Sequence, residues 1–180
     1  MNLVIRRLLA FGLDYLVIIG YLIVLAGVSL AMLASGLRTA YSAAWATPWS
    51  AEAMGFLMLT LPVVLYFAIL ESSTAGATLG KRALRLRVRG LDGKRLGPWR
   101  SLLRSAVKFL PWELAHFTIW HYVFATTAHA QPPRWTTISL AFVYALVAAY
   151  LITLVVGESH RTIYDRVAGS SVLLIGGGSG

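Results

Sequence analysis

The sequence predicts an all-α membrane protein with four transmembrane helices and a basic hairpin or amphipathic segment between helices two and three. Three observations predict this fold: a high share of apolar residues, their grouping in long blocks, and a one-sided distribution of basic residues. Of the 180 residues, 58% are hydrophobic and 13% are charged, whereas a soluble domain carries about 25% charged residues. Residues 1–175 are therefore expected to form a single membrane domain, and the Gly/Ser tail 176–180 to be a flexible linker outside the fold.

Four apolar blocks are long enough, or nearly long enough, to cross a bilayer, which takes about 20 residues. They cover residues 8–34, 53–70, 102–128 and 136–156. The third block is the least apolar, since Glu113 lies inside it. The first block is too long for the apolar region of a signal peptide, which spans about 7–15 residues.

Basic residues gather on one side of this four-helix topology. Of the sixteen Lys and Arg residues, fourteen fall on the side of the N-terminus: Arg6, Arg7, Lys81, Arg82, Arg85, Arg87, Arg89, Lys94, Arg95, Arg100, Arg104, Lys108, Arg161 and Arg166. Only Arg38 and Arg134 fall on the other side. The positive-inside rule then predicts that both termini and the loop between helices two and three are cytoplasmic. This placement accounts for the net charge of +9 without nucleic acid.

The cytoplasmic loop has structure of its own. Apolar residues alternate with arginines over residues 84–89, which is the periodicity of a strand. Asp92-Gly93 is typical of a hairpin turn, so residues 94–96 are expected to return as the partner strand. A helix is predicted to start after Gly97-Pro98.

In that helix, Arg100, Arg104 and Lys108 are spaced i, i+4 and i+8 and form one basic row. Two interpretations stay open. The row is either a cytoplasmic ridge lying against anionic headgroups, or a patch that binds an anionic ligand or partner.

Asp14 is the clearest ionisable residue within a predicted span. An ionised side chain at the bilayer centre costs about 2.5–3.5 kcal/mol on insertion scales, so it needs a partner. Arg7 lies two helical turns before Asp14, on nearly the same face, and is the expected partner. Asp14 is either a carboxylate that binds a proton or cation, or a carboxylate that locks helix packing through a structural ion pair or hydrogen bonds.

Other carboxylates and a histidine are weaker candidates. Glu71 and Glu158 end the second and fourth spans, where boundary placement explains them. Glu113 and His116 lie on one face of the third span and could form a hydrogen-bonded pair or a proton relay. A di-metal site would need a second Glu-x-x-His copy, and a chain without cysteine has no thiolate ligands. No metal or other cofactor is therefore expected.

The two halves of the chain contain similar motifs in the same order. The first half contains Arg7, Asp14, Glu71 and the run Thr78-Leu79-Gly80-Lys81-Arg82; the second contains Arg104, Glu113, Glu158 and the run Thr162-Ile163-Tyr164-Asp165-Arg166. Both hairpins run out and back in the same sense, so this similarity predicts a parallel repeat of the kind found in some transporters.

These motifs resemble the RDD family of small bacterial integral membrane proteins, named for one arginine and two aspartates. Arg7, Asp14 and Asp165 match the three letters, and the run 78–82 with the basic strand is similar to the family's central signature. The resemblance covers nearly the whole chain. The charge-free fourth span and the Glu113/His116 pair are not family features. The cytoplasmic motif residues are Glu71, Thr78, Gly80, Lys81, Arg82, Glu158, Asp165 and Arg166.

The resemblance implies a multi-pass protein of the bacterial inner membrane. It implies transport, with sodium–proton antiport in some members, and an adaptor role beside degradation machinery in others. We therefore expect a small ion/proton antiporter using Arg7, Asp14, Glu113 and His116, or a non-transporting adaptor or accessory subunit. Expected partners are lipid with anionic headgroups, a second copy or another membrane protein. An enzyme is not expected, because no nucleophile–base pair or phosphate loop is present.

Overall fold

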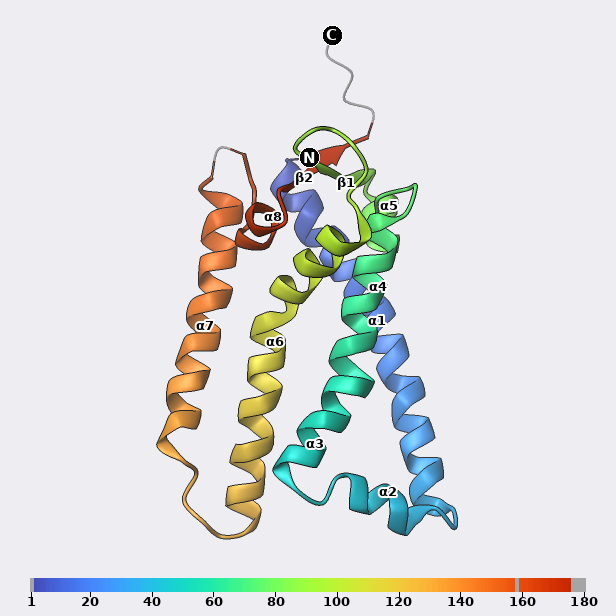
Figure 1. Ribbon diagram of the computed structural model, residues 1–180, viewed down its shortest axis with the longest axis vertical. Coiled ribbons are helices and arrows are strands. Elements are labelled where there is room, and N and C mark those ends of the chain that lie inside the picture. The colour runs from blue at the N-terminus through green and yellow to red at the C-terminus, as the bar shows by residue number, and fades with distance from the viewer. Residues whose placement is uncertain (1, 158, 176–180) are drawn as a thin grey trace. The chain divides into compact units, whose positions relative to one another are not determined.

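The structure is a computed structural model that describes residues 2–157 and 159–175, most of them helical (Figure 1). The predicted linker at 176–180 lies outside the described residues. The elements in chain order are α1 (Leu3–Ala34), α2 (Arg38–Ala44), α3 (Pro48–Gly55), the π-helix η1 (Phe56–Thr60), α4 (Leu61–Ser72), α5 (Leu79–Ala83), β1 (Leu86–Gly90), α6 (Pro98–Thr127), α7 (Arg134–Val155), α8 (Ile163–Val167) and β2 (Ser170–Leu174).

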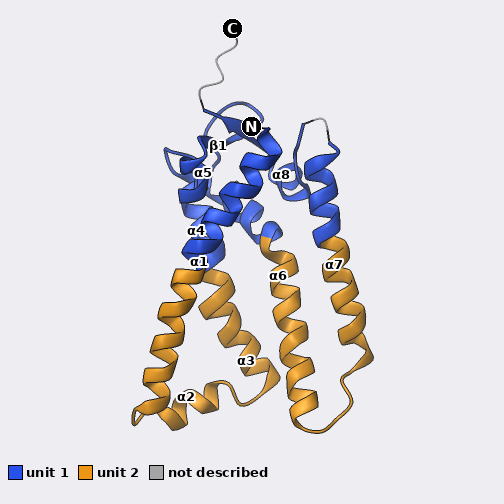
Figure 2. Cartoon of the chain, turned by 180° about the vertical axis from the view of Figure 1, so that it is seen from behind, with its two compact units in different colours: residues 1–18, 63–108, 147–180 blue, residues 19–62, 109–146 orange. Residues whose placement is uncertain are grey.

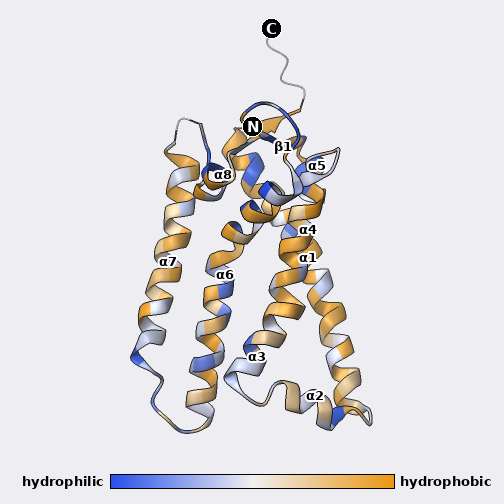
Figure 3. Cartoon of the chain, in the orientation of Figure 1, coloured by the Kyte–Doolittle hydropathy of each residue, from blue (hydrophilic) through white to orange (hydrophobic). Residues whose placement is uncertain are grey.

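Within the described residues, three helices are long and apolar enough to cross a membrane. They are α1 with 32 residues, the continuous helix Pro48–Ser72 with 25, and α7 with 22. Figure 3 shows these helices as predominantly hydrophobic, whereas α6 mixes hydrophobic and hydrophilic residues. The chain is thus a mostly helical, multi-pass membrane protein, and α6 is a fourth long helix at the place of the third predicted span.

The helices begin and end where local chemistry favours it. Thr47 caps α3 through a reciprocal pair of hydrogen bonds with Ser50, and Pro48 occupies the first turn, where its missing N–H is not needed. Thr78 caps α5 and Thr162 caps α8. The π-helical turn in the second apolar helix leaves the Met58 carbonyl to accept a hydrogen bond from the Tyr21 hydroxyl at 2.6 Å.

The chain divides into two compact units (Figure 2). Unit 1 comprises residues 1–18, 63–108 and 147–180, and unit 2 comprises residues 19–62 and 109–146. Each of the long helices therefore contributes one part to each unit.

Unit 1 contains a two-stranded sheet. Strand β1 pairs antiparallel with β2, with Leu86 opposite Leu174 and Gly90 opposite Ser170. The apolar side chains of the sheet, those of Leu86, Val88 and Val172, pack with Ala10 of α1 and Leu96 into the apolar core of this unit.

The predicted strand is confirmed, but the predicted hairpin is wrong about its partner. A turn does form at Asp92-Gly93, where the Gly90 amide donates to the Lys94 carbonyl at 3.0 Å. Residues 94–96 then leave the sheet, since Leu96 is taken up by the apolar core. The distant strand β2 offers five paired positions instead.

Unit 2 holds α2, α3, η1 and the adjoining parts of the long helices. Aromatic rings fill much of it. The imidazole of His121 lies 4.8 Å from the ring of Trp49, 4.5 Å from Phe117 and 5.2 Å from Trp135, measured between ring centroids. These contacts join α3, α6 and α7 inside this unit.

Candidate functional site: a buried charge cluster in unit 1

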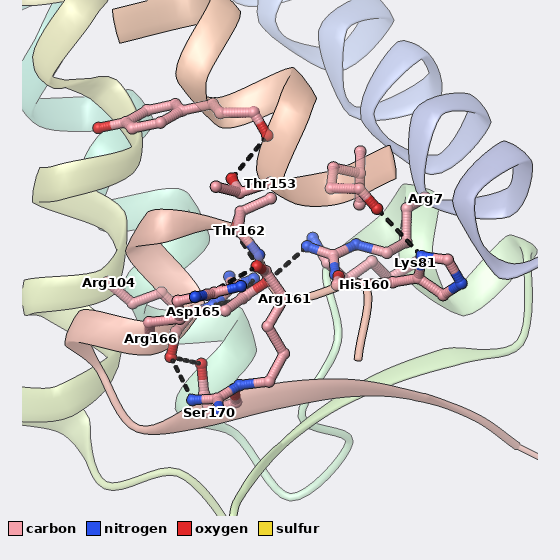
Figure 4. A network of polar contacts seen from close by, with 12 residues as sticks. Arg7, Lys81, Arg104, Thr153, His160, Arg161, Thr162, Asp165, Arg166 and Ser170 are labelled. Atoms are coloured by element: carbon pink, nitrogen blue, oxygen red, sulfur yellow. Dashed lines mark hydrogen bonds and ion pairs between the residues drawn. The ribbon is translucent and has the colours of Figure 1, made fainter. Parts of the chain in front are cut away.

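Asp165 is the point on which two arginines converge (Figure 4). Its Oδ2 lies 2.6 Å from Arg7 Nη2, and its Oδ1 accepts hydrogen bonds from Nε and Nη2 of Arg104 at 2.9 and 2.6 Å. The carboxylate also completes the capping box of α8, accepting from the amide and hydroxyl of Thr162 at 3.1 and 2.8 Å. Asp165 is fully buried.

These contacts set the charge state of Asp165. Burial by itself raises the pKa of the carboxyl group, but the guanidinium groups of Arg104 and Arg7 outweigh it and hold the pKa well below its ordinary value. Asp165 is therefore an anion throughout the physiological pH range. It ties the start of α1 and the start of α6 to the short helix α8.

Arg104 links this carboxylate to a second one. Its Nη1 donates to Oε2 of Glu71 on α4, and Lys81 Nζ of α5 lies 2.9 Å from Oε1 of the same carboxylate. Glu71 is fully buried, and Arg104 is only 1% exposed. A charge buried this deeply is tolerated when it is paired and hydrogen-bonded.

Asp14 is held differently, by neutral donors. Its Oδ2 accepts from the Thr78 hydroxyl at 2.6 Å, and its Oδ1 accepts from the Gly80 amide at 2.8 Å and from the Tyr66 hydroxyl at 2.9 Å. Two of these donors belong to the N-terminal turn of α5, where amide groups lack partners within the helix. Asp14 is fully buried.

The predicted Arg7–Asp14 ion pair is therefore wrong. The two residues share a face of α1, as expected, but Arg7 pairs with Asp165 and also donates to the carbonyl of His160. The N-terminal turn of α5 provides two of the hydrogen-bond donors to Asp14. The buried Asp165 is instead neutralised by Arg7 of α1 and Arg104 of α6.

Gly80 makes this arrangement possible. A Cβ atom added at Gly80 would lie 2.1 Å from the Ala10 carbonyl oxygen and 3.0 Å from Cγ of Asp14. Backbone atoms cannot move aside at such a separation. Glycine is therefore required for α5 to approach α1 closely enough to donate to Asp14.

Two of the three residues in the basic row at the start of α6, Arg104 and Lys108, face the interior of unit 1, whereas Arg100 is exposed. Arg100 donates to the carbonyls of Ala168 and Gly169, and Arg104 binds the two carboxylates described above. The Nζ of Lys108 lies 3.4 Å from the centroid of the Phe67 ring. The interpretation of this row as a headgroup-facing ridge is thus wrong, because the carboxylates of α4 and α8 draw it inward.

The remaining motif residues lie outside the cluster. Arg82 and Arg166 are exposed and donate to backbone carbonyls, Arg82 to Ala77 at 3.1 Å and Arg166 to Arg161 at 3.3 Å. Glu158 lies outside the described residues.

Glu113 and His116 belong to unit 2, so they are not part of this cluster. Glu113 lies near Glu52 of α3, a residue that sequence reasoning did not single out, and each carboxyl group has one buried oxygen without a hydrogen-bond partner. The His116 ring lies edge-on to Trp112 with centroids 4.9 Å apart. Within residues 2–157 and 159–175, no three His, Asp or Glu side chains gather in a way that could hold a metal ion.

The repeat predicted from the motifs has a structural counterpart. Helix α5 starts at residue 79 and β1 at 86, while α8 starts at 163 and β2 at 170, an offset of 84 residues in both cases. In both copies of the repeat, the short helix that precedes the strand begins at a threonine N-cap, Thr78 for α5 and Thr162 for α8. The two strands of the repeat pair with each other, which brings Thr78 and Thr162 into one unit.

Tyr66 also belongs to the cluster and was not predicted as a site residue, whereas Arg104 and Lys108 were predicted only as members of the basic row of α6. A signal for Arg104 existed, since the repeat places it opposite Arg7 in the second half of the chain. Tyr66 carries no such signal, because a tyrosine in an apolar span is indistinguishable from a packing residue.

Buried arginines and carboxylates that join the ends of several apolar helices define a polytopic membrane protein with a charge cluster at one end. The RDD family matches residues 2–169 of the chain. The chain belongs to the RDD family. No curated protein and no solved structure matches it.

Proposed function

We propose that the chain is a small secondary transporter that exchanges a cation for a proton, with Asp14 as the exchanging carboxylate. The supporting observation is the environment of Asp14. It is fully buried, and its three hydrogen-bond donors are neutral, whereas Glu71 and Asp165 are each paired with two cationic side chains. A carboxylate without a bound guanidinium retains the charge that a proton or cation can neutralise.

The proposal includes four membrane crossings. Asp14 contacts Thr78 and Gly80, so the loop after α4 and the start of α1 share a side. The pairing of β1 with β2 puts the segment after α7 on that side as well. An even number of crossings must separate β1 from β2, so if α7 crosses the membrane then α6 does too.

The proposed orientation places both termini in the cytoplasm of a bacterial cell, with the protein in the inner membrane. All fourteen basic residues assigned to the cytoplasmic side by sequence fall in unit 1, and Arg38 and Arg134 fall in unit 2. This distribution supports a cytoplasmic unit 1.

Flux measurements in proteoliposomes test the transport proposal. A cation gradient is expected to drive proton movement reported by an internal pH dye, and Asp14→Asn is expected to abolish it. Asp92→Asn is the matched control, because Asp92 lies in the exposed turn after β1. Cation-driven proton flux that survives Asp14→Asn would exclude the proposed exchange site.

A second candidate is a non-transporting adaptor or accessory subunit, whose partner is a second copy or another membrane protein. One observation favours it: unit 1 presents Arg82, Arg85, Lys94 and Arg95 on its surface together with Trp99, which is 75% exposed. Such a surface suits anionic headgroups or an acidic partner. A stoichiometric partner that copurifies from native membranes and is lost on Arg85→Glu/Arg95→Glu substitution supports this role. We expect neither role to involve enzymatic chemistry.

A further inference from the structure

The outward face of the two-stranded sheet carries two arginines, Arg87 and Arg89. They alternate with apolar core residues along β1, so their side chains share the face that points away from the core of unit 1. Across the sheet they lie opposite Leu173 and Ser171 of β2. Because Cα atoms two residues apart in a strand are separated by about 6.6 Å, both guanidinium groups can reach one ligand.

Gly76 fixes how these two side chains lie. Its carbonyl accepts a hydrogen bond from the Val88 amide at 2.7 Å, so the loop after α4 runs along the edge of β1 that β2 leaves free. A Cβ atom added at Gly76 would lie 2.7 Å from Nη1 of Arg89 and 3.2 Å from Cγ of Arg87. Both arginines therefore pack against the same backbone position.

The guanidinium nitrogens divide into covered and open ones. Nε of Arg87 and Nη1 of Arg89 are buried and have no hydrogen-bond partner among the described residues. The other four nitrogens reach the surface, and they donate to no group of residues 2–157 and 159–175. They form an Nη1–Nη2 pair on Arg87 and an Nε–Nη2 pair on Arg89, the two forks with which arginine binds anion oxygens. Arg104 uses its own Nε and Nη2 in this way on Asp165.

The positive charge of these arginines is not neutralised within the described part of the chain. The ion pairs there involve other basic side chains, and Asp92, in the turn after β1, accepts from the Lys94 amide at 3.0 Å. Burial and the charges of Arg87 and Arg95 lower the pKa of Arg89 from its ordinary value. A guanidinium nevertheless keeps its proton in proteins, so two positive charges remain close together.

We propose that Arg87 and Arg89 bind a phosphate monoester or free phosphate on the outward face of the sheet. Such an anion carries a charge of about −1.5 to −2 at pH 7, which matches two guanidinium groups, and its three free oxygens can accept from both forks. A carboxylate has one charge and two oxygens, and would fill one fork only. The hydroxyl of Ser171, opposite Arg89, is a further donor on this face.

The phosphate group belongs either to a soluble molecule or to the headgroup of a lipid such as phosphatidic acid. Both sources offer the same oxygens to the arginines, and the experiment below separates them. The site requires neither transport at Asp14 nor an adaptor role, so its failure would leave both proposed functions as they stand.

Two probes test the site on the purified full chain in non-ionic detergent. Potassium phosphate supplies the free anion, with potassium chloride of equal ionic strength as the blank, and titration calorimetry measures binding. Dioctanoyl phosphatidic acid supplies the headgroup, with phosphate-free dioctanoylglycerol as the blank, and native mass spectrometry counts bound lipid. Wild type is expected to bind one phosphate group per chain. Saturation by inorganic phosphate supports a soluble ligand, and binding of phosphatidic acid alone supports a headgroup.

Variants separate this site from the general charge of unit 1. Arg87→Gln/Arg89→Gln is expected to weaken binding at least about tenfold. Arg85→Gln/Lys94→Gln removes the same charge from two exposed positions of unit 1 and is expected to bind as wild type. Arg87→Lys/Arg89→Lys keeps both charges but lacks the forks, so its affinity is also expected to fall about tenfold.

Thermal unfolding in chloride separates binding from a role in the fold. Arg87→Gln/Arg89→Gln should melt no lower than wild type, because it removes two neighbouring like charges. A melting temperature well below that of wild type would assign the arginines to the fold and overturn the site. Wild-type affinity of both double variants at positions 87 and 89, dioctanoylglycerol binding as strong as that of phosphatidic acid, or no binding of either phosphate probe would overturn it as well.

Discussion

Gly80 has the closest backbone approach among the residues of the cluster. A methyl group there would meet the Ala10 carbonyl oxygen at 2.1 Å, and the N-terminal turn of α5 would have to move away from Asp14. Gly12 on α1, by contrast, has open space around the position of an added Cβ.

We therefore expect Gly80→Ala to lower the free energy of unfolding by about 2 kcal/mol or more, as steric overpacking and a lost buried hydrogen bond do. Gly12→Ala, the matched control, should be neutral or slightly stabilising, because alanine is the better helix former. Thermal unfolding in detergent, followed by circular dichroism, measures both. Equal melting temperatures for the two variants would contradict the close approach.

Asp165→Asn should remove the anion that holds Arg7 and Arg104. We expect a loss of about 3 kcal/mol at pH 7, since the variant leaves buried guanidinium groups without their counter-charge. Because the pKa of Asp165 is lowered in the folded protein, its stabilisation is complete well above the unfolded-state pKa of about 3.9. It is lost progressively as the pH falls below that value.

The difference in stability between wild type and Asp165→Asn should therefore be largest near neutral pH and shrink toward pH 3. Unfolding by denaturant across this pH range measures it. A difference that stays constant with pH would mean that Asp165 is not ionised in the native state.

At the same scale, the sequence indicated which residues matter better than it indicated their partners. Arg7, Asp14, Thr78 and Gly80 all lie in the cluster, in agreement with the family motifs. Helical spacing suggested Arg7 for Asp14, because spacing along one helix is visible in a sequence. The actual partner of Arg7 is Asp165, which lies 158 residues farther along the chain and comes close to Arg7 only in the folded protein.

Among the elements, strand β1 was predictable and its partner was not. The alternation of apolar residues and arginines over residues 84–89 depends only on local periodicity. Residues 170–174 lack such a clean alternation, since Leu173 and Leu174 are adjacent. Asp92-Gly93 makes the turn expected of a hairpin, but the chain after it enters α6 instead of returning.

The register of β1 and β2 makes a cross-linking prediction. Amides of Leu91 and Ile175 donate to the carbonyls of Gly169 and Arg85, so the pair Val88–Val172 falls at a position without mutual hydrogen bonds. There Cα atoms lie about 4.5 Å apart, close enough for a disulfide with slight adjustment.

We expect the double substitution Val88→Cys/Val172→Cys to form an internal disulfide on mild oxidation, detected as a shift in gel mobility. The chain has no other cysteine to compete. In the control Val88→Cys/Leu173→Cys, the two side chains point to opposite faces of the sheet, so cross-linking should be slower. Equal rates would argue for a different register.

For the whole molecule, hydropathy and charge carried most of the prediction. The four long helices were expected from apolar blocks, and the division of the chain into two units follows the division of its basic residues. Hydropathy is least informative for α6, because this helix carries several polar residues. Arg104 near its start belongs to the charge cluster, and Glu113 farther along the helix lies near Glu52.

Cysteine labelling tests the four proposed crossings. Ala130→Cys, in the turn between α6 and α7, should react with a membrane-impermeant maleimide on intact spheroplasts, whereas Lys94→Cys should react only after lysis. Both positions are exposed. If both cysteines react from the same side, α6 does not cross the membrane; a reversed pattern would contradict the orientation.

The pairing of β1 with β2 also has a consequence for biosynthesis. Strand β1 leaves the ribosome about eighty residues before its partner, and Arg7 is made long before Asp165. Until β2 and Asp165 have been made, β1 therefore has an unpaired edge and the Arg7 guanidinium lacks its carboxylate partner. A nascent chain stalled before α8 would expose both features to proteases and chaperones. The sheet can therefore close only after α8 and β2 have been made.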